Sequence, residues 1–398
     1  MTTQRILEQI LVPRPNGSTA LERVGSFLSS ALEQNGALVG IHEFTATPYG
    51  FQLTWAVVLV LMGGYVAAIA THRYRIALLL PLVVAGLLLL EFEFLRSPVS
   101  GLLSATERNI IGTYPGQPDG PTLIFSAHYD TTTHFGDHYS WGTWGSRQGP
   151  ATLLAIGLAS LGLWRRRRNK TIPAALALPL ACLAVVPFAA MFWFQSMGPI
   201  LRTPSPGAID NGGSVAALVL LAQDLSERPA NLPTTVKLVF LAAEEERALG
   251  SWEFAKTLDP AAPLAVINLE SIGADPRVAY IPEDGFALQR YRSRDSLIGF
   301  VNQTARSIWG EELQPRELPF GTLTDGRSFL AHGVNAVTLR AFTGDAFPRN
   351  LHSSHDSRER ISTAAIERTS KLLRAIVHRA DSHPDYFPAA RSDEPDSP

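Results

Sequence analysis

The sequence predicts an α/β fold: a three-layer α/β/α domain with a mixed, mostly parallel central sheet, interrupted by two transmembrane helical hairpins. Short apolar runs rich in Val, Ile, Leu and Phe alternate with stretches of helical periodicity, as in sheets that are covered on both faces. Four longer apolar segments form two pairs, each joined by a short basic loop. Charged residues make up only 18% of the chain, against about 25% in typical soluble domains. The mean hydropathy of +0.08 also favours a membrane protein with a soluble part.

The α/β part is predicted from four apolar runs and three helical stretches. The predicted strands are 122–130, 235–245, 264–273 and 335–342, and the predicted helices are 213–225, 294–310 and 364–380. Polar residues lie at or just beyond the end of each strand, and ligands of open α/β sheets gather at the carboxyl ends of the strands. A functional site is therefore expected there. The polar tail 390–398 is predicted to be disordered.

The four apolar segments are 51–70, 76–95, 149–164 and 172–194. The first has no charged residue over 20 positions, enough to cross a hydrocarbon core of about 30 Å. Glu91 and Glu93 place the last turn of the second near an interface, and the third is short for a span. The alternative is a set of buried helices in a soluble protein, but uncharged runs of about 18 residues or more are rare in soluble cores.

The loops THRYR (71–75) and RRRRNK (165–170) hold seven Lys and Arg residues between them. Short basic loops stay on the cytoplasmic side of a membrane. We therefore predict four spans, with both hairpin tips in the cytoplasm and the rest of the chain outside it. No cleavable signal peptide is predicted at the N-terminus. A nucleic-acid role for the arginine run is disfavoured, because apolar segments flank it and the chain has 34 Lys and Arg against 36 Asp and Glu.

Side chains that bind metals follow the predicted strands. They are His128 and Asp130, Asp210 after a Gly-Pro-rich turn, Glu244 and Glu245, Glu270, and His352. Taken singly, each has an ordinary reading as a helix cap, a solvated helix start or a surface residue. Together they form a mixed nitrogen and oxygen donor set that suits zinc, while manganese and cobalt remain open. Asp130 is placed to orient the imidazole of His128.

Five motifs occur in a fixed order, namely AHYD (127–130), GAIDNGG (207–213), AAEEERALGS (242–251), INLESIG (267–273) and LHSSHD (351–356). This order resembles the di-zinc aminopeptidases of metallopeptidase family 28. Segments 10–36 and 320–339 resemble further parts of the same family. Three positions depart from the family pattern, because Ile209, Glu270 and Leu351 stand where the family usually has Asp, Asp and Tyr. None of these departures removes a ligand.

The resemblance implies a site with two Zn²⁺ ions per chain. In it, Asp210 bridges the two ions, His128 and Glu270 complete one ligand set, and Glu245 and His352 complete the other. Glu244 is implied as the general base and Asp130 as the residue that orients His128. Three neighbours are expected to play lesser parts: Glu246 exposed, Asp356 setting a local turn, and His355 beside it but not a ligand.

The implied function is that of a membrane-anchored zinc exopeptidase, an aminopeptidase acting outside the cytoplasm on peptides with a free N-terminus. The alternatives are a glutaminyl-cyclase-like enzyme, which would use one zinc, and a non-catalytic membrane receptor or scaffold. The expected partners are peptides and the lipid bilayer, with no nucleic acid and no prediction of oligomeric state. The peptidase domain is expected to comprise 1–50, 96–148 and 195–389, with hairpins at 51–95 and 149–194.

Overall fold

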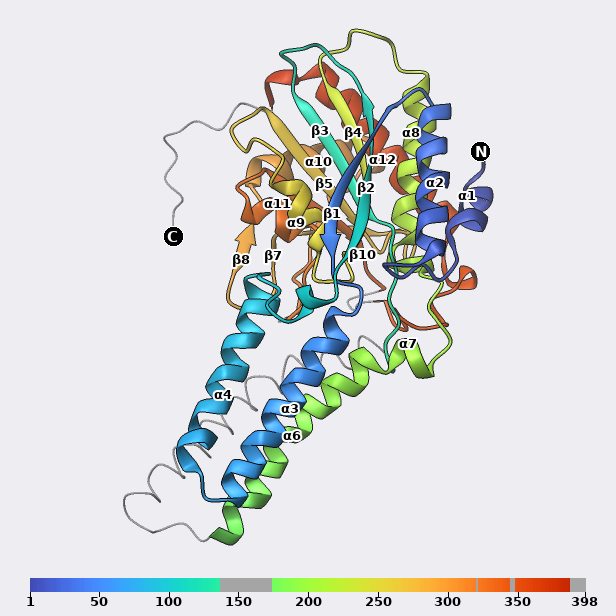
Figure 1. Ribbon diagram of the computed structural model, residues 1–398. Helices are drawn as coiled ribbons and strands as arrows, with labels where there is room; N and C mark the ends of the chain where they lie inside the picture. The colour runs from blue at the N-terminus through green and yellow to red at the C-terminus, as the bar shows by residue number, and fades with distance from the viewer. Residues whose placement is uncertain (137–173, 320, 344–347, 387–398) are drawn as a thin grey trace.

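A computed structural model describes residues 1–136, 174–319, 321–343 and 348–386 of the chain. The predicted span 149–164, the arginine loop 165–170 and the tail 390–398 lie outside these residues. Within them, an α/β/α domain stands on a bundle of long apolar helices (Figure 1). The fold class predicted from the sequence is confirmed.

The central sheet has eight strands in the order β1-β2-β4-β3-β5-β10-β6-β9. Its four middle strands run parallel to one another and match the four predicted runs: β4 (Thr235–Leu241), β3 (Thr122–His128), β5 (Leu264–Glu270) and β10 (Ala336–Ala341). Antiparallel pairs add β2 (Ala105–Tyr114) and β1 (Leu38–Ala46) on one side and β6 (Val278–Ile281) on the other, and β9 (Gln314–Pro315) pairs with β6 in parallel. A separate hairpin joins β7 (Glu283–Gly285) to β8 (Arg290–Arg292).

Helices cover both faces of this sheet, because its central strands are apolar on both sides. On β3, Leu123 and Phe125 pack into the larger core and Ile124 packs into the smaller one on the opposite face. The larger core lies under α1 (Thr3–Ile10), α2 (Thr19–Gln34), α8 (Gly213–Ser226), α10 (Asp295–Trp309) and α12 (Thr363–Ser382). The smaller core lies under α9 (Leu249–Ala255) and α11 (Gly326–Ala331). Short helical turns are α7 (Gly198–Leu201), η2 (Ser100–Leu102), η3 (Ala208–Gly212), η4 (Arg358–Arg360) and η5 (Pro384–Tyr386).

Three of the predicted apolar segments form helices beneath the α/β domain. They are α3 (Gly50–Ala70), α4 (Tyr74–Leu88) continued by η1 (Leu89–Glu93), and α6 (Ala174–Ser196). Gly50–Ala70, Tyr74–Glu93 and Leu178–Ser196 are long and apolar enough to cross a membrane. Only 39%, 28% and 22% of their apolar windows are buried within the protein. The alternative of buried core helices is therefore wrong for these three segments.

The helix α4 and its continuation η1 end where the apolar helices meet the α/β domain, and both acidic residues of the segment are buried there. Glu91 and Glu93 are 0% and 2% exposed. Glu91 accepts hydrogen bonds from the backbone N–H groups of Val99 (2.7 Å) and Ser100 (3.0 Å). These hydrogen bonds satisfy the buried carboxylate of Glu91, so the end of this helix is bonded to the α/β domain.

Candidate metal centre

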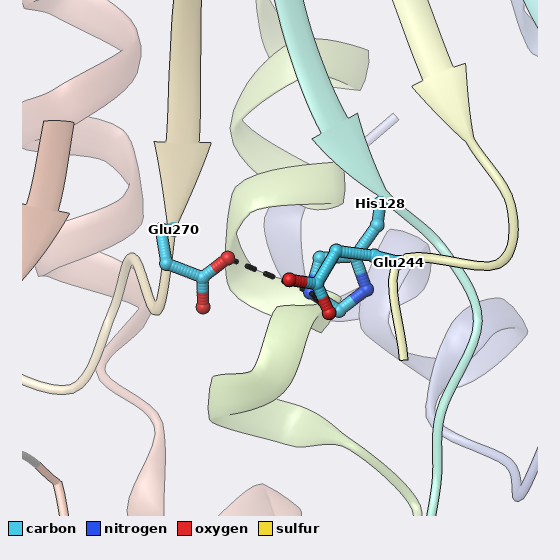
Figure 2. Close-up of side chains that lie close together, drawn as sticks. All are labelled: His128, Glu244 and Glu270. Carbon is cyan, nitrogen blue, oxygen red and sulfur yellow. Dashed lines mark ion pairs between the residues drawn. The ribbon is translucent and has the colours of Figure 1, made fainter. Parts of the chain in front are cut away.

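The predicted site residues come together at the edge of the sheet where the parallel strands end. His128 is the last residue of β3 and Glu270 the last of β5, and Glu244 follows β4 (Figure 2). Asp210 lies in η3, the turn that leads into α8, and His352 lies in the loop after β10. Residues from five segments of the chain are thereby placed around one point.

Asp210 divides its carboxylate between two histidines. Its Oδ1 lies 3.1 Å from His128 Nε2, and its Oδ2 lies 2.9 Å from His352 Nε2. Two ligand atoms of one tetrahedral zinc ion, each about 2.0–2.2 Å from the metal, are expected about 3.4 Å apart. The separations on both sides of Asp210 are close to this value, so each oxygen of Asp210 could share a cation with one histidine.

A glutamate completes the donor atoms on each side. Glu270 Oε2 lies 3.5 Å and Glu244 Oε2 lies 3.9 Å from His128 Nε2. On the other side, Glu245 Oε2 lies 3.1 Å from His352 Nε2. Among the described residues, two groups can each hold a metal ion: His128 with Glu244 and Glu270, and Asp210 with Glu245 and His352.

The donor atoms of this cluster are better suited to binding a metal ion than to forming hydrogen bonds with one another. Both ring nitrogens of His128 and Oε1 of Glu245 are buried and make no hydrogen bond to the described residues. Buried polar atoms are normally satisfied, and an unsatisfied one is costly. Imidazole nitrogens and carboxylate oxygens that converge in this way are the ligands that zinc takes in proteins.

The charges of the cluster shift the pKa values of its members strongly. Burial alone would lower the pKa of His128, but Glu244 and the other carboxylates around it raise that pKa well above its usual value. The pKa of His352 is raised well above its usual value in the same way, with Glu245 as the main carboxylate. Burial raises the pKa of Glu245 to about 6 and that of Glu244 well above its usual value. A buried cluster that holds carboxylates and imidazoles so far from their usual pKa values is typical of a functional site.

Asp130 lies beside His128, where the sequence places an orienting residue. Its Oδ1 is 3.4 Å from His128 Nδ1. The same carboxylate accepts hydrogen bonds from the backbone N–H groups of Glu244 and Glu245, each at 3.2 Å, and from Asn16 Nδ2 at 2.8 Å. Asp130 therefore connects the loop after β3 to the loop after β4.

Glu246 is buried, so the expectation that it would be exposed is wrong. Its exposed fraction is 7%, and its Oε2 accepts a hydrogen bond from the backbone N–H of Thr47 at 2.6 Å. Burial raises the pKa of Glu246 to about 8. Thr47 lies just before α3, so this contact brings the start of the first apolar helix against the glutamate loop. His355 is exposed, as expected.

Asp356 does more than the local turn expected of it. It is fully buried, and its carboxylate accepts hydrogen bonds from the backbone N–H groups of Ile209 (2.7 Å) and Asp210 (3.1 Å). Asn211 donates through Nδ2 to Glu270 Oε2 at 3.3 Å. Neither contact can be predicted from the local sequence, although Asp356 lies in the LHSSHD motif and Asn211 lies in the GAIDNGG motif.

Arg14 is a further supporting residue that the sequence reasoning missed. It is completely buried, and its guanidinium donates to the carbonyl oxygens of Tyr129 (2.5 Å), Pro206 (2.7 Å) and Gly207 (3.2 Å). Gly207 has a φ of +61°, and a Cβ there would lie 2.2 Å from Thr131 Cγ2, so the close approach of these loops requires glycine. Arg14 thus holds together the two segments that carry His128 and Asp210.

His134 was also missed, and it touches a predicted ligand directly. Its Nδ1 lies 3.1 Å from His352 Nδ1, and the two ring centroids are 4.5 Å apart. If His352 presents the lone pair of Nε2 to a metal, its Nδ1 carries the hydrogen and donates it to His134. The other side of the His134 ring packs on Phe194 of α6, at 4.5 Å between centroids.

Comparisons with known proteins agree with this geometry. A family model described as peptidase family M28 matches residues 194–377, which include every predicted ligand except His128. The resemblance to this family, predicted from the five motifs, is confirmed. No match is found among curated proteins.

Solved structures of similar fold include enzymes of two activities. A glutaminyl cyclase from Porphyromonas gingivalis is 15% identical, with a TM-score of 0.52 and 95% of each chain covered. A zinc aminopeptidase from Bacillus subtilis is 12% identical, with a TM-score of 0.53 and again 95% of each chain covered. A zinc-dependent exopeptidase from Parabacteroides distasonis is 14% identical, with a TM-score of 0.53, 94% of this chain and 96% of that chain covered. At these identities the likeness shows a shared fold.

Proposed function

We propose that this chain is a membrane-anchored, zinc-dependent aminopeptidase that holds two zinc ions and uses Glu244 as its general base. The observation that carries the proposal is the division of the Asp210 carboxylate between His128 (3.1 Å) and His352 (2.9 Å). In the proposed assignment, Glu270 completes the set on the side of His128, and Glu245 completes the set on the side of His352.

The exposure of the side chains supports Glu244 as the base rather than as a permanent ligand. Its side chain is 13% exposed, whereas those of His128 and Glu270 are 1% and 5% exposed. Glu244 is therefore the most exposed side chain of the cluster, which suits a base that exchanges a proton with water. Asp130 holds the backbone N–H of Glu244 and so fixes the position of the base.

The chemistry that follows is hydrolysis of the first peptide bond. When bound, two zinc ions polarise the scissile carbonyl and make a water molecule more acidic. The carboxylate of Glu244 accepts a proton from that water, whose oxygen forms the new bond to the carbonyl carbon. As the C–N bond breaks, Glu244 gives the proton to the departing nitrogen. Asp130 keeps His128 in the orientation that presents Nε2 to the centre.

The experiment that tests this function is release profiling on a library of free peptides with the purified full chain in detergent, with zinc added and then chelated. Release of single N-terminal residues that stops on chelation and returns with zinc is the expected result. Release that continues at full rate after complete removal of the metal would contradict the mechanism. Metal analysis of the same protein tests the alternative of a non-catalytic scaffold, which would hold no zinc and would release no residue.

A glutaminyl-cyclase-like reaction is the second candidate, supported by the similar fold of the Porphyromonas gingivalis glutaminyl cyclase. Mass spectrometry of a peptide that begins with glutamine distinguishes the two reactions. A peptidase releases free glutamine and shortens the peptide, whereas a cyclase releases ammonia and leaves the peptide at full length. The two complete donor groups favour the peptidase.

The proposed topology places the peptidase domain, composed of 1–50, 96–148 and 195–389, outside the cytoplasm, with hairpins 51–95 and 149–194 in the membrane. The loop between α3 and α4 supports it, because Arg73 and Arg75 are exposed at the end of the bundle farthest from the α/β domain (Figure 1). A reporter inserted within 165–170 should behave as cytoplasmic and one at the C-terminus as external. The reverse pattern would contradict this orientation.

A further inference from the structure

The metal centre lies at the end of the α/β domain that faces the apolar helices. The strands β3, β4, β5 and β10 end at the edge of the sheet from which α3, α4 and α6 extend (Figure 1). The site lies at that same edge. Contacts between the helix ends and the ligand-bearing loops show how close the two parts are.

The end of α6 packs against the loop that follows His128. Phe135 N–H donates to the carbonyl oxygen of Phe194 at 2.8 Å. Two successive ring distances of 4.5 Å lead from Phe194 through His134 to the predicted ligand His352. A Cβ at Gly198, just beyond α6, would lie 2.2 Å from the carbonyl oxygen of Thr133, so there is no space between this helix end and the loop.

The first hairpin is bonded to the same edge at two points. Arg247, three residues after Glu244, donates from its guanidinium to the Glu91 carboxylate at 2.6 Å. Glu93 accepts hydrogen bonds from the backbone N–H groups of Leu288 (3.2 Å) and Gln289 (2.6 Å). The ends of α6 and of α4 with η1 therefore contact the rim of the site, and Thr47, just before α3, contacts Glu246 of the glutamate loop.

The lengths of these helices set the height of the site above a membrane. The apolar stretches have 21, 20 and 19 residues. At about 1.5 Å per residue each is about 30 Å long, which is the thickness of the hydrocarbon core. No helical turn remains on the side of the α/β domain, because the further residues of α6 (Ala174–Ser196) lie at its other end, so the helix ends that touch the site lie at the bilayer surface.

The connecting segments at this edge expose large apolar side chains. Leu288 is 71% exposed beside Glu93, and Leu102 is 73% exposed in η2. Ile200 and Leu201 are exposed in α7, which follows α6 directly. Exposed apolar side chains that continue from a membrane-spanning surface fit the interfacial region of a bilayer, and a soluble domain would rarely gather them on one side.

We propose that the natural substrates are polypeptides held at the same membrane surface, with a free N-terminus close to the bilayer and a lipid or apolar anchor a short distance along the chain. This inference rests on the proposed aminopeptidase function and adds the class of substrate. A peptide confined to the membrane meets the site at a high effective concentration. Because the site lies at the bilayer surface, a short spacer between the N-terminus and the anchor is enough.

The test uses the full chain, loaded with zinc, in phosphatidylcholine vesicles. Peptides of identical N-terminal sequence carry a C-terminal palmitoyl-lysine or a plain lysine, with spacers of about 6 or about 40 residues, the shorter reaching about 20 Å when extended. We expect kcat/KM to be at least about tenfold higher for the anchored peptide with the short spacer than for its free counterpart. The long spacer should give no larger gain, because effective concentration falls as a linker lengthens beyond the distance it must span. The gain should disappear when enzyme and anchored peptide are placed in separate vesicles.

The outcomes separate this inference from the function it rests on. Hydrolysis of free and anchored peptides at equal rates, or a gain that only the long spacer gives, would overturn the inference and leave the aminopeptidase intact. No zinc-dependent hydrolysis of any peptide, in vesicles or in detergent, would overturn the function itself.

A depth measurement tests the placement without any substrate. In a Cys182→Ser background, Leu288→Cys at the site edge and Leu38→Cys at the start of β1, the opposite end of the sheet, are labelled with a fluorophore. The two positions are similarly exposed, at 71% and 65%. Brominated lipids should quench the label at 288 at least about twofold more than the label at 38, since quenching requires contact with the bilayer. Equal quenching would contradict the placement.

Discussion

The guanidinium of Arg247 is held by the carboxylate of Glu91, at 2.6 Å between Nη1 and Oε2, with both side chains buried. Glu91 belongs to the end of an apolar helix, and Arg247 belongs to the loop that carries Glu244 and Glu245. The hydroxyl oxygens of Thr47 (3.0 Å) and Ser100 (2.9 Å) accept further hydrogen bonds from Arg247. The hairpin of apolar helices α3 and α4 and the glutamate loop are thus parts of one buried polar network.

Loss of Glu91 should therefore destabilise the protein far more than loss of a surface partner. Glu91→Ala leaves a buried, unpaired Arg247 and is expected to lower the free energy of unfolding by about 3–5 kcal/mol. Glu43→Ala is the control, because its pair with Arg108 is exposed, and it should cost no more than about 1 kcal/mol. Denaturant unfolding in a single detergent measures both, and similar losses would contradict the role of the network.

The two histidines of the LHSSHD motif should differ in metal binding. His352→Ala removes a donor that lies 2.9 Å from Asp210 and 3.1 Å from Glu245, so bound zinc should fall from about two ions per chain to about one. His355→Ala, three residues away and exposed, should leave the zinc content unchanged. Elemental analysis of the purified variants gives the answer. Loss of zinc in the His355 variant would show that the ligand is misassigned.

Two neighbouring glutamates should differ in catalysis. Glu244→Gln should lower kcat by about 10²–10⁴-fold and keep the zinc, since an amide cannot accept the proton. Glu246→Gln should stay within about twofold of wild type, because a pKa of about 8 leaves Glu246 mostly protonated at neutral pH, and glutamine resembles that form. Steady-state hydrolysis of an aminoacyl chromophore checks both. Full activity of Glu244→Gln would end the proposed mechanism.

His134 should act on zinc binding through His352. His134→Phe keeps a ring against Phe194 but removes the acceptor that lies 3.1 Å from His352 Nδ1. Zinc affinity should weaken by about 10–100-fold, the usual effect of losing the residue that orients a ligand. His332→Phe is the matched control, because the ring of His332 packs on Trp252 and its Nδ1 contacts Ser328, not a predicted ligand. Competition with a chromogenic chelator measures the affinities, and equal values would leave His134 without this role.

Asp284 should make stability depend on pH. Burial raises its pKa to about 6 from an ordinary 3.8, although hydrogen bonds from Thr324 oppose the rise. A buried carboxyl with a raised pKa stabilises the fold at pH values below its ordinary pKa of 3.8. This contribution, about 3 kcal/mol in all, is lost as the pH rises through the pKa of the folded state, about 6.

The variant Asp284→Asn has no carboxyl group at this position, so its stability should not fall in this way as the pH rises. Relative to wild type, the variant should therefore gain about 3 kcal/mol in the free energy of unfolding between about pH 4 and pH 8. The metal ligands titrate alike in both proteins, so the difference isolates Asp284. Denaturant unfolding across this pH range is the measurement, and a constant difference between the two proteins would contradict the raised pKa.

The central strands and the polar residues that meet at their ends could be predicted from the sequence, because their signals are local. Each middle strand is a continuous apolar run that ends in a polar residue, and the order of the five motifs distinguishes a site from scattered acids. The strands β1 and β2 were not predicted. In ATERNIIGTY, the sequence of β2, polar residues break the apolar run, because the strand lies toward the edge of the sheet.

The residues that support the ligands could not be found in this way, because their contacts join distant segments. Glu246 was expected at the surface because the motif assigns Glu244 and Glu245 to the site, but the backbone of Thr47, 199 positions away, packs against it. His134 lies only six residues after His128, yet its contact is with a histidine 218 positions away. Local pattern carries no information about such pairs.

The burial of Arg14 has a consequence for how the enzyme is made. Its hydrogen-bond acceptors Pro206 and Gly207 lie 192 and 193 positions further along the chain, and His352 lies later still. A nascent chain therefore cannot assemble the centre until the segment that carries His352 has been translated, which comes after all the apolar segments. A chain that ends before His352 would lack a donor of one predicted metal group and so could not perform the proposed reaction.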